Sequence, residues 1–313
     1  IMSIDRSPHI KYYSGSINKS EKFDRVLSYN NRKEYKYQKE KKDIIHNGQR
    51  KLLMSEIEFI CNEYHKLGVG KKIFLYIGAS TGSRISIHSY TLVKMFPEFE
   101  FHLYDRSDFY HKLHGLGNVK IFQRWFTEDD SKKYRGKNVF MISDIRDPDI
   151  KKQISNNNTK KQDEIFFNDM ILQMKFYNAV KPKSALLKFR LSWYPGKTKY
   201  LGGDIYYQVW QGANSTECRL VPDSTMKTYD HIKHEESLHY FNTVTRYEFY
   251  PHKYLCYGHC YDCMSEIHIL ENYIKLKNKK IVVCKLGQKI TKELSMYSNR
   301  SLFKNTPIGK YKI

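Results

Sequence analysis

Four charged residues stand at positions where a strand or helix begins or ends, or where a charge is unusual. Lys51 opens an amphipathic helix, Asp144 ends an apolar strand, Lys188 interrupts the apolar run 185–189, and Glu217 opens another strand. A lysine inside a strand is rarely buried without a partner. Two lysines and two carboxylates that converge would satisfy all four charges, so a structural ion network is the better interpretation of any single residue. The same group can supply a general base, because burial and a second ammonium lower the pKa of a lysine while carboxylates orient it.

A second pattern indicates a cofactor that contains a nucleoside. The apolar run 72–77 ends in Gly78, and Gly82 follows in a turn of small residues. Glycines let the backbone approach a ligand where a side chain would block it. Asp105 ends the next strand, where an acidic residue can bind two ribose hydroxyls. A dinucleotide site or a plain tight turn has a similar pattern.

The elements that must position these residues alternate along the chain. Hydrophobic periodicity predicts helices at 52–67, 84–96, 163–180 and 265–277, and strands at 72–77, 99–104, 119–125, 139–143, 184–191, 205–211 and 217–221. The Asn- and Lys-rich stretch 151–162 is predicted to be a loop. Such alternation predicts an α/β fold with an open mixed sheet flanked by helices, which binds ligands at the carboxyl ends of its strands. We expect residues 1–44 to form a basic N-terminal extension, 45–285 the domain, and 286–313 a basic C-terminal tail.

The charge favours a polyanionic partner. Lys and Arg number 54 against 33 Asp and Glu, a formal net charge of +21, and the chain contains 26 Tyr, 17 Phe and 3 Trp. Basic and aromatic residues together fit single-stranded RNA better than a membrane. A Lys-rich proteome is the alternative explanation of the charge. We expect no transmembrane helix, because no window approaches ~18 uninterrupted apolar residues, and no signal peptide, because residues 1–20 lack an apolar core.

The six cysteines do not indicate a disulfide scaffold at this length, so we expect a reducing compartment. One group could hold zinc, and it consists of Cys256, Cys260, Cys263, His252 and His259. Its spacing lacks a second well-spaced pair of ligands, so buried or free thiols are the favoured interpretation and no metal is expected.

Ordered segments of the chain resemble a known family. These are residues 48–53, 76–82, 142–146, 187–190 and 215–220. Together they are similar to the poxvirus-type cap-specific mRNA (nucleoside-2′-O-)-methyltransferases, whose members double as the small, regulatory subunit of the viral poly(A) polymerase. The resemblance implies a Rossmann-like, S-adenosylmethionine-dependent methyltransferase fold over roughly residues 45 to 245.

The resemblance also implies roles for individual residues. The catalytic tetrad would be Lys51, Asp144, Lys188 and Glu217, with Lys188 as the base. The S-adenosylmethionine site would be lined by Gln49, Tyr76, Gly78, Gly82, Asp105, Phe126, Asp144 and Arg146. Cap or RNA would meet Arg190, Trp193, Ser215 and Glu235, with Trp193 stacked on the methylated guanine. The chain departs from the family pattern at Thr81, Ser107, Pro195 and Asn214. The family's N-terminal cap tyrosine has no clear match, and the candidates to take its place are Tyr29, Tyr35 and Tyr37.

The expected function is methyl transfer to the ribose 2′-hydroxyl of the first transcribed nucleotide of capped mRNA. By resemblance, the expected setting is the cytoplasm, in a viral factory or virion. A poly(A) polymerase catalytic subunit is a further expected partner, and neither DNA nor a membrane is expected. Three alternatives are a ribosomal or transfer RNA 2′-O-methyltransferase, a non-catalytic processivity subunit, and a purely structural basic protein.

Overall fold

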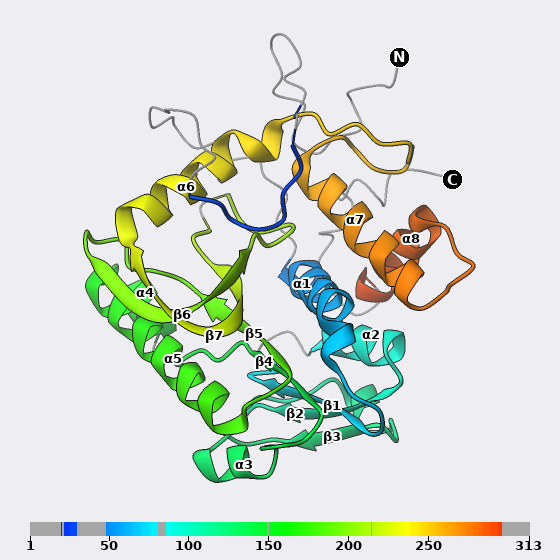
Figure 1. Cartoon of the computed structure of the whole chain (residues 1–313), viewed down its shortest axis with the longest axis horizontal. Helices are drawn as coiled ribbons and strands as arrows, with labels where there is room; N and C mark the ends of the chain where they lie inside the picture. Colours follow the sequence, from blue (N-terminus) through cyan, green and yellow to red (C-terminus); the bar gives the residue numbers. More distant parts are fainter. Residues whose placement is uncertain are drawn as a thin grey trace. The chain divides into compact units, whose positions relative to one another are not determined.

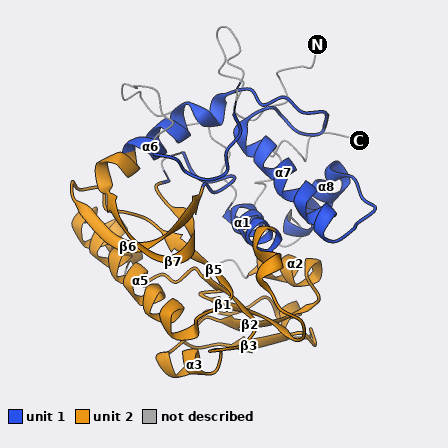
Figure 2. Cartoon of the chain, in the orientation of Figure 1, with its two compact units in different colours: residues 1–61, 207–215, 236–313 blue, residues 62–206, 216–235 orange. Residues whose placement is uncertain are grey.

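The structure, a computed structural model, describes residues 20, 22–29, 48–80, 86–148, 150–213 and 215–295. The chain divides into two compact units, which Figure 2 shows in different colours. Unit 1 is assigned residues 1–61, 207–215 and 236–313, and unit 2 residues 62–206 and 216–235. The two units are interleaved along the chain, and the domain limits expected from the sequence stay a prediction.

Unit 2 is built on one seven-stranded sheet with the order β3-β2-β1-β4-β5-β7-β6. The strands are Lys72–Ile77 (β1), Phe99–Tyr104 (β2), Val119–Phe122 (β3), Val139–Ser143 (β4), Ser184–Phe189 (β5), Lys197–Tyr206 (β6) and Cys218–Asp230 (β7). Strands β1 to β5 pair in parallel, and β7 is antiparallel to both β5 and β6. This confirms the α/β, Rossmann-like fold with an open mixed sheet. The strand order reverses between β1 and β4, which is where such sheets bind ligands.

Helices cover both faces of this sheet. They are α2 (Ile87–Met95), α3 (Glu128–Lys132), α4 (Ile150–Ser155) and α5 (Thr159–Val180). Helices α3 and α4 pack against α5 along one side of the sheet, and α2 lies on the other (Figure 1). The central strands are therefore buried on both faces, which explains why their sequences are continuous apolar runs.

Unit 1 contains the described helices α1 (Gly48–Glu63, up to residue 61), α7 (Tyr261–Leu276) and α8 (Val283–Ser295), and the later part of α6 (His231–Thr243). Buried ion pairs join its segments. They are Arg25–Glu58 at 2.8 Å, Arg50–Glu266 at 2.5 Å and Arg246–Asp262 at 2.9 Å. Each guanidinium also donates hydrogen bonds to neighbouring oxygens, which a buried charge requires. The Arg25 pair holds residues 22–29 of the expected N-terminal extension within unit 1.

Several predicted elements need correction. The predicted loop 151–162 is mostly helical, because Lys and Gln favour helices and the Asn158 side chain accepts the Lys161 amide at the start of α5. The predicted strand 205–211 has the wrong limits, since β6 begins earlier, at Lys197, and ends at Tyr206. Strand β7 continues to Asp230, beyond the predicted 221, because ladder hydrogen bonds with β6 hold a stretch that is largely exposed. Helices α3, α6 and α8 were not predicted.

Helix α8 occupies the first part of the expected C-terminal tail. Leu286, Ile290 and Leu294 recur at helical spacing and are buried, so the ordered chain extends well past residue 286. In the described part of the chain, no helix is long and apolar enough to cross a membrane.

A glycine at the end of β1 is required by the fold itself. Gly78 has φ +78°, and a Cβ at this position would lie 2.7 Å from the carbonyl carbon of Asp144 and 2.9 Å from the amide of Ile145. The space beside Gly78 is thus filled by the backbone that follows β4. The strands β1 and β4 approach closely here because residue 78 has no side chain.

We predict that Gly78→Ala destabilises unit 2 by about 2 kcal/mol or more, since it adds both a left-handed φ and a backbone clash. Chemical denaturation would measure the loss. The control is Gly117→Ala, because an added Cβ there meets no atom within 4 Å. Equal stability of the two variants would contradict the close approach of β1 and β4.

Candidate active site

Charged residues lie side by side at the carboxyl edge of the sheet in unit 2. Lys188 of β5 pairs in register with Arg219 of β7. Asp144 directly follows Ser143, the β4 residue that pairs with Leu187. Because paired positions on neighbouring strands are adjacent in space, one carboxylate and two cations form a row across β4, β5 and β7.

The Asp144 carboxylate forms ion pairs with both cations. Its Oδ1 lies 2.9 Å from Lys188 Nζ and 2.9 Å from Arg219 Nη1. The Lys188 ammonium also donates hydrogen bonds to the carbonyl oxygens of Ile145 at 3.0 Å and Asp144 at 3.3 Å. The side chains of Lys188, Arg219 and Asp144 are only 7%, 2% and 15% exposed. Two buried cations therefore share one carboxylate.

Glu217 joins this group through arginines. Its Oε1 lies 3.2 Å from Arg219 Nη2, and its Oε2 lies 3.3 Å from Arg146 Nη2. Asp144, Lys188 and Glu217, three of the four predicted tetrad residues, thus belong to one ion network within unit 2. The fourth, Lys51, lies in the first turns of α1 in unit 1, where its carbonyl accepts a hydrogen bond from Ser55. Gln49 lies on the same helix.

The network shifts the pKa values of its members in opposite ways. Burial lowers the pKa of the Lys188 ammonium below its ordinary value, and the nearby Asp144 opposes this shift only in part. Burial acts to raise the pKa of Asp144, but Lys188 and Arg219 outweigh it and leave that pKa well below the usual range. The arrangement combines a fixed carboxylate with an ammonium that is easier than usual to deprotonate.

Sequence reasoning missed two members of this neighbourhood. Arg219 lies in the run 218–221, two positions after Glu217. A charged residue inside this otherwise apolar run was the signal that could have marked it as a site residue. Asp169 on α5 accepts the Asp147 amide at 3.2 Å, and burial raises the pKa of its carboxyl to about 6. Nothing in the sequence marked Asp169, because it is one of several polar residues on a long helix.

Two of the predicted cofactor residues, Gly78 and Asp105, directly follow β1 and β2 at this edge of the sheet. The Asp105 carboxylate accepts the amides of Ser80 at 3.0 Å and Ser107 at 2.8 Å, which fixes its orientation at the end of β2. Each of its oxygens can accept a further hydrogen bond, so the group suits a pair of ribose hydroxyls. Gly78 serves backbone packing, as described above, rather than leaving room for a ligand. These donors and acceptors fit the nucleoside part of a cofactor.

The other predicted cofactor residues differ in exposure. Tyr76 is buried in β1, with its hydroxyl 3.4 Å from His88 Nε2. Phe126 is also buried, with its ring centroid 4.9 Å from those of Tyr104 and Phe176. Arg146 is half-exposed. Gly82 and Thr81 lie outside the described residues.

The predicted cap-binding residues are divided between the two units. Arg190 and Trp193 lie in the loop after β5, with the guanidinium carbon 4.1 Å from the centre of the indole ring. Glu235 lies in α6 in unit 2, whereas Ser215 belongs to unit 1, where its carbonyl accepts from Asn242. Pro195 is exposed. Asn214, Tyr35 and Tyr37 lie outside the described residues.

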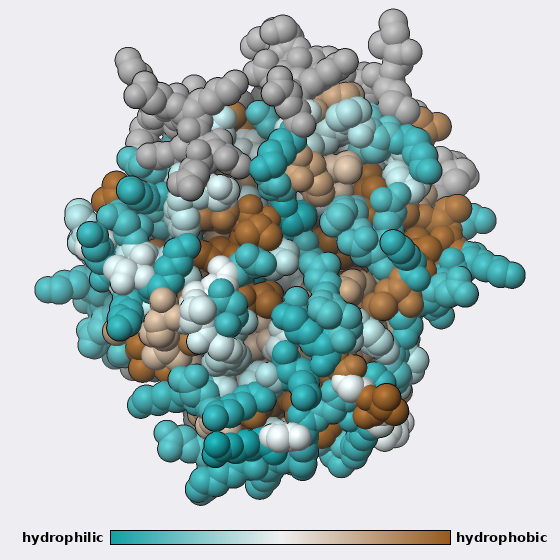
Figure 3. Space-filling model, viewed as in Figure 1, coloured by the Kyte–Doolittle hydropathy of each residue, from teal (hydrophilic) through white to brown (hydrophobic). Residues whose placement is uncertain are grey.

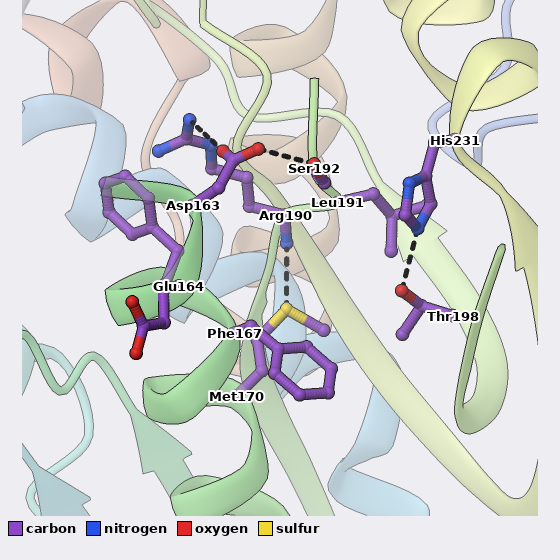
Figure 4. A pocket seen from close by; sticks show the side chains of 10 residues that line it. Asp163, Glu164, Phe167, Met170, Arg190, Leu191, Ser192, Thr198 and His231 are labelled. Carbon is purple, nitrogen blue, oxygen red and sulfur yellow. Dashed lines mark hydrogen bonds and ion pairs between the residues drawn. The ribbon is translucent and has the colours of Figure 1, made fainter. Parts of the chain in front are cut away.

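A pocket of about 300 Å³ opens beside Arg190 (Figure 4). It is lined by Asp163, Glu164, Phe166, Phe167, Met170, Arg190, Leu191, Ser192, Thr198 and His231. Part of its lining is apolar, and its polar groups come from the start of α5, the loop after β5, β6 and the start of α6. Such a combination of aromatic and polar lining is typical of small-ligand and nucleobase sites.

The cysteines of unit 1 include a disulfide that the sequence did not predict. Cys256 is bonded to Cys284, while Cys260 and Cys263 are buried thiols that form no disulfide. Disulfide pairing cannot be deduced from spacing alone, and Cys284 was not part of the predicted cluster. The ring nitrogens of His252 and His259 lie 2.6 Å and 3.0 Å from backbone carbonyls. Among the residues that the structure describes, no three His, Cys, Asp or Glu side chains are arranged to hold a metal.

Comparison with known proteins places the chain in a family. Residues 20–296 match the family model described as poly A polymerase regulatory subunit. The chain belongs to this family. The resemblance expected from the sequence is thereby confirmed, over nearly the whole described chain. No curated protein sequence matches the chain significantly.

A more distant likeness is found among solved structures. Bluetongue virus VP4, described as a multifunctional RNA-capping production line, shares 12% identity with a TM-score of 0.42. The match covers 66% of this chain and 33% of VP4, so the chain spans about a third of that protein.

We predict that Arg219→Met lowers the free energy of unfolding by about 3 kcal/mol. The substitution removes a cation that balances the buried negative charges of Asp144 and Glu217. Urea denaturation would measure the change. Arg135→Met is the control, since Arg135 is exposed. If Arg219→Met were as stable as this control, the shared-carboxylate network would not contribute to folding.

Proposed function

We propose that the chain is an S-adenosylmethionine-dependent methyltransferase that modifies the ribose 2′-hydroxyl of the first transcribed nucleotide of capped mRNA. The observation that carries the proposal is the buried Lys188 ammonium, held by Asp144 and two backbone carbonyls at the carboxyl edge of a Rossmann-like sheet. Membership of the poly A polymerase regulatory subunit family supports an RNA substrate. The net charge of +21 supports it as well.

Each residue of the site has its own proposed role in methyl transfer. When bound, S-adenosylmethionine supplies a methyl group on a sulfonium. Asp105 would bind the cofactor's ribose hydroxyls, and the segment around Gly78 would lie beside them. Neutral Lys188 would accept the proton of the 2′-hydroxyl at Nζ as the oxygen becomes nucleophilic. Asp144 and the carbonyl of Ile145 would keep the amine oriented, and Asp144 would stabilise the ammonium that forms.

Electrostatics explain why Lys188 suits this role better than an exposed lysine. An unperturbed lysine is almost fully protonated at neutral pH and is a poor base. Burial lowers the pKa of Lys188, and the cations of Arg146 and Arg219 act in the same direction. The carboxylates of Asp144 and Glu217 limit this shift, so that the protonated form also stays bound in place. Lys51, on α1, is proposed as the fourth member of the tetrad by family resemblance.

The surface is compatible with a polyanionic substrate. On the face shown in Figure 3, hydrophilic residues dominate the surface of the described chain, and hydrophobic residues form separate patches. Arg190 and the exposed Trp193 supply a cation and an aromatic ring in the loop that follows β5, the strand of the proposed base. We propose that this loop meets the capped end of the RNA, together with Glu235 and Ser215. The cytoplasm is the proposed site of action.

A second candidate function is favoured by the family match. The chain would act as the regulatory subunit of a poly(A) polymerase, with the catalytic subunit as its partner. This role needs no methyl transfer and is compatible with the first. The two functions can be separated, because only one of them requires the Lys188 amine.

We predict that Lys188→Met reduces methyl transfer to capped RNA at least ~100-fold, the usual loss when a general base is removed. Binding of S-adenosylmethionine and stimulation of poly(A) polymerase should persist. In the wild type, the single-turnover rate should rise with pH as Lys188 loses its proton and level off below the ordinary lysine pKa of 10.5.

The matched control is Lys183→Met, an exposed lysine just before β5, which should retain full activity. Methyl transfer is followed with radiolabelled cofactor on capped and uncapped RNA of the same sequence. Unchanged activity of Lys188→Met would contradict the proposed mechanism. Equal activity on both RNAs would contradict the cap-specific substrate.

A further inference from the structure

One carboxylate organises the loop that follows β5. Asp163, near the start of α5, accepts a hydrogen bond from the Ser192 hydroxyl and another from the Trp193 amide at 3.1 Å, both at Oδ2. Its Oδ1 lies 3.4 Å from Arg190 Nη2. Figure 4 shows Asp163 between Arg190 and Ser192 at the edge of the pocket. The side chain is only 9% exposed, so these contacts take the place of water.

The cation that Asp163 holds lies over two aromatic rings. The guanidinium carbon of Arg190 lies 3.7 Å from the ring centre of Phe166 and 4.1 Å from that of Trp193. Phe166 follows Asp163 by three positions on α5, so the two residues lie on the same face of the helix. Asp163 and Phe166 therefore fix Arg190 from one side, and the Trp193 backbone amide is fixed by the same carboxylate.

Within the described chain, the neighbours of Arg190 satisfy only part of its hydrogen-bonding capacity and balance only part of its charge. Its Nε is buried and makes no hydrogen bond within the described chain, and its side chain is 9% exposed. Burial lowers the pKa of the guanidinium to about 10, and Asp163 opposes this shift only in part. A buried donor without a partner is costly unless a ligand completes it. An RNA phosphate or another anionic group of the capped end has the chemistry to do so.

We infer that Asp163 is a positioning residue for RNA binding, which sets Arg190 and Trp193 without touching the substrate. This inference rests on the proposed function. Asp163 holds Arg190 at a distance that orients the guanidinium without fully neutralising it. Through Ser192 and the amide of Trp193, it fixes the backbone that presents the indole. Loss of the Asp163 carboxylate would remove the contacts that hold both the Arg190 guanidinium and the Trp193 indole in place.

The test compares Asp163→Asn with Glu164→Gln. Each substitution removes one negative charge from the same turn of α5, and both residues line the pocket. Glu164, however, pairs with Lys161 at 2.9 Å rather than with the loop. Simple Coulomb attraction predicts that either loss strengthens RNA binding. If Asp163 acts by positioning Arg190 and Trp193, the Asp163→Asn substitution alone should weaken RNA binding instead.

We predict that Asp163→Asn raises both the Kd and the KM for a short capped RNA about tenfold. Its kcat and its affinity for S-adenosylmethionine should stay near wild type, and Glu164→Gln should bind RNA at least as well as wild type. Fluorescence anisotropy with a labelled capped oligonucleotide gives the Kd independently of methyl transfer. If Asp163→Asn proves poorly folded, Ser192→Ala removes one contact without changing the charge and should weaken RNA binding in the same sense.

The inference is overturned if Asp163→Asn binds RNA as tightly as wild type, or if Glu164→Gln loses affinity equally. It is also overturned if cofactor affinity and kcat fall together with RNA affinity, since that pattern means general damage to unit 2. Absence of methyl transfer in the wild type, with RNA binding that still depends on Asp163, would refute the proposed catalysis and leave this inference standing.

Discussion

The ion pairs of Asp144 with Lys188 and Arg219 are the constraint on which the proposed chemistry depends. Two cations on neighbouring antiparallel strands would repel each other in a buried position, and one carboxylate at 2.9 Å from both allows them to stay. The same pairing places the Lys188 amine beside the carbonyls that follow β4. The strand order that brings β4, β5 and β7 together therefore also positions Lys188, the proposed base.

The two compact units are stabilised by different interactions. Unit 2 contains the sheet, the ion network and the aromatic pocket, and its edge is set by backbone contacts such as that of Gly78 with Asp144. Unit 1 is fixed by buried arginine–carboxylate pairs, among them Arg50 with Glu266. Because Arg50 precedes Lys51, this pair determines where the first turns of α1 lie within unit 1. Unit 1 and unit 2 thus each contain a buried ion network of arginine and carboxylate groups, and the catalytic role is proposed only for the network in unit 2.

The sequence predicted the central strands well because residues such as those of 72–77 and 139–143 are buried on both faces and stay apolar throughout. Prediction from the sequence failed where an element is held by hydrogen bonds rather than by burial, as in the exposed part of β7. It also failed for short polar helices such as α4. Asp144, Lys188 and Glu217 were predicted as a group and share one network. Arg219 and Asp163 were missed, because their roles arise from strand register and from a loop contact, neither of which leaves a local pattern.

The central claim is that the folded environment makes the Lys188 amine easier to deprotonate. The most direct measurement is an NMR titration of the lysine side-chain Cε and Nζ signals, with the Lys188 signal assigned from its absence in Lys188→Met. The account predicts a pKa for Lys188 below the ordinary lysine value of 10.5, because burial disfavours its ammonium form. A Lys188 pKa at or above 10.5 would mean that Asp144 outweighs burial, and it would contradict the assignment of Lys188 as the base.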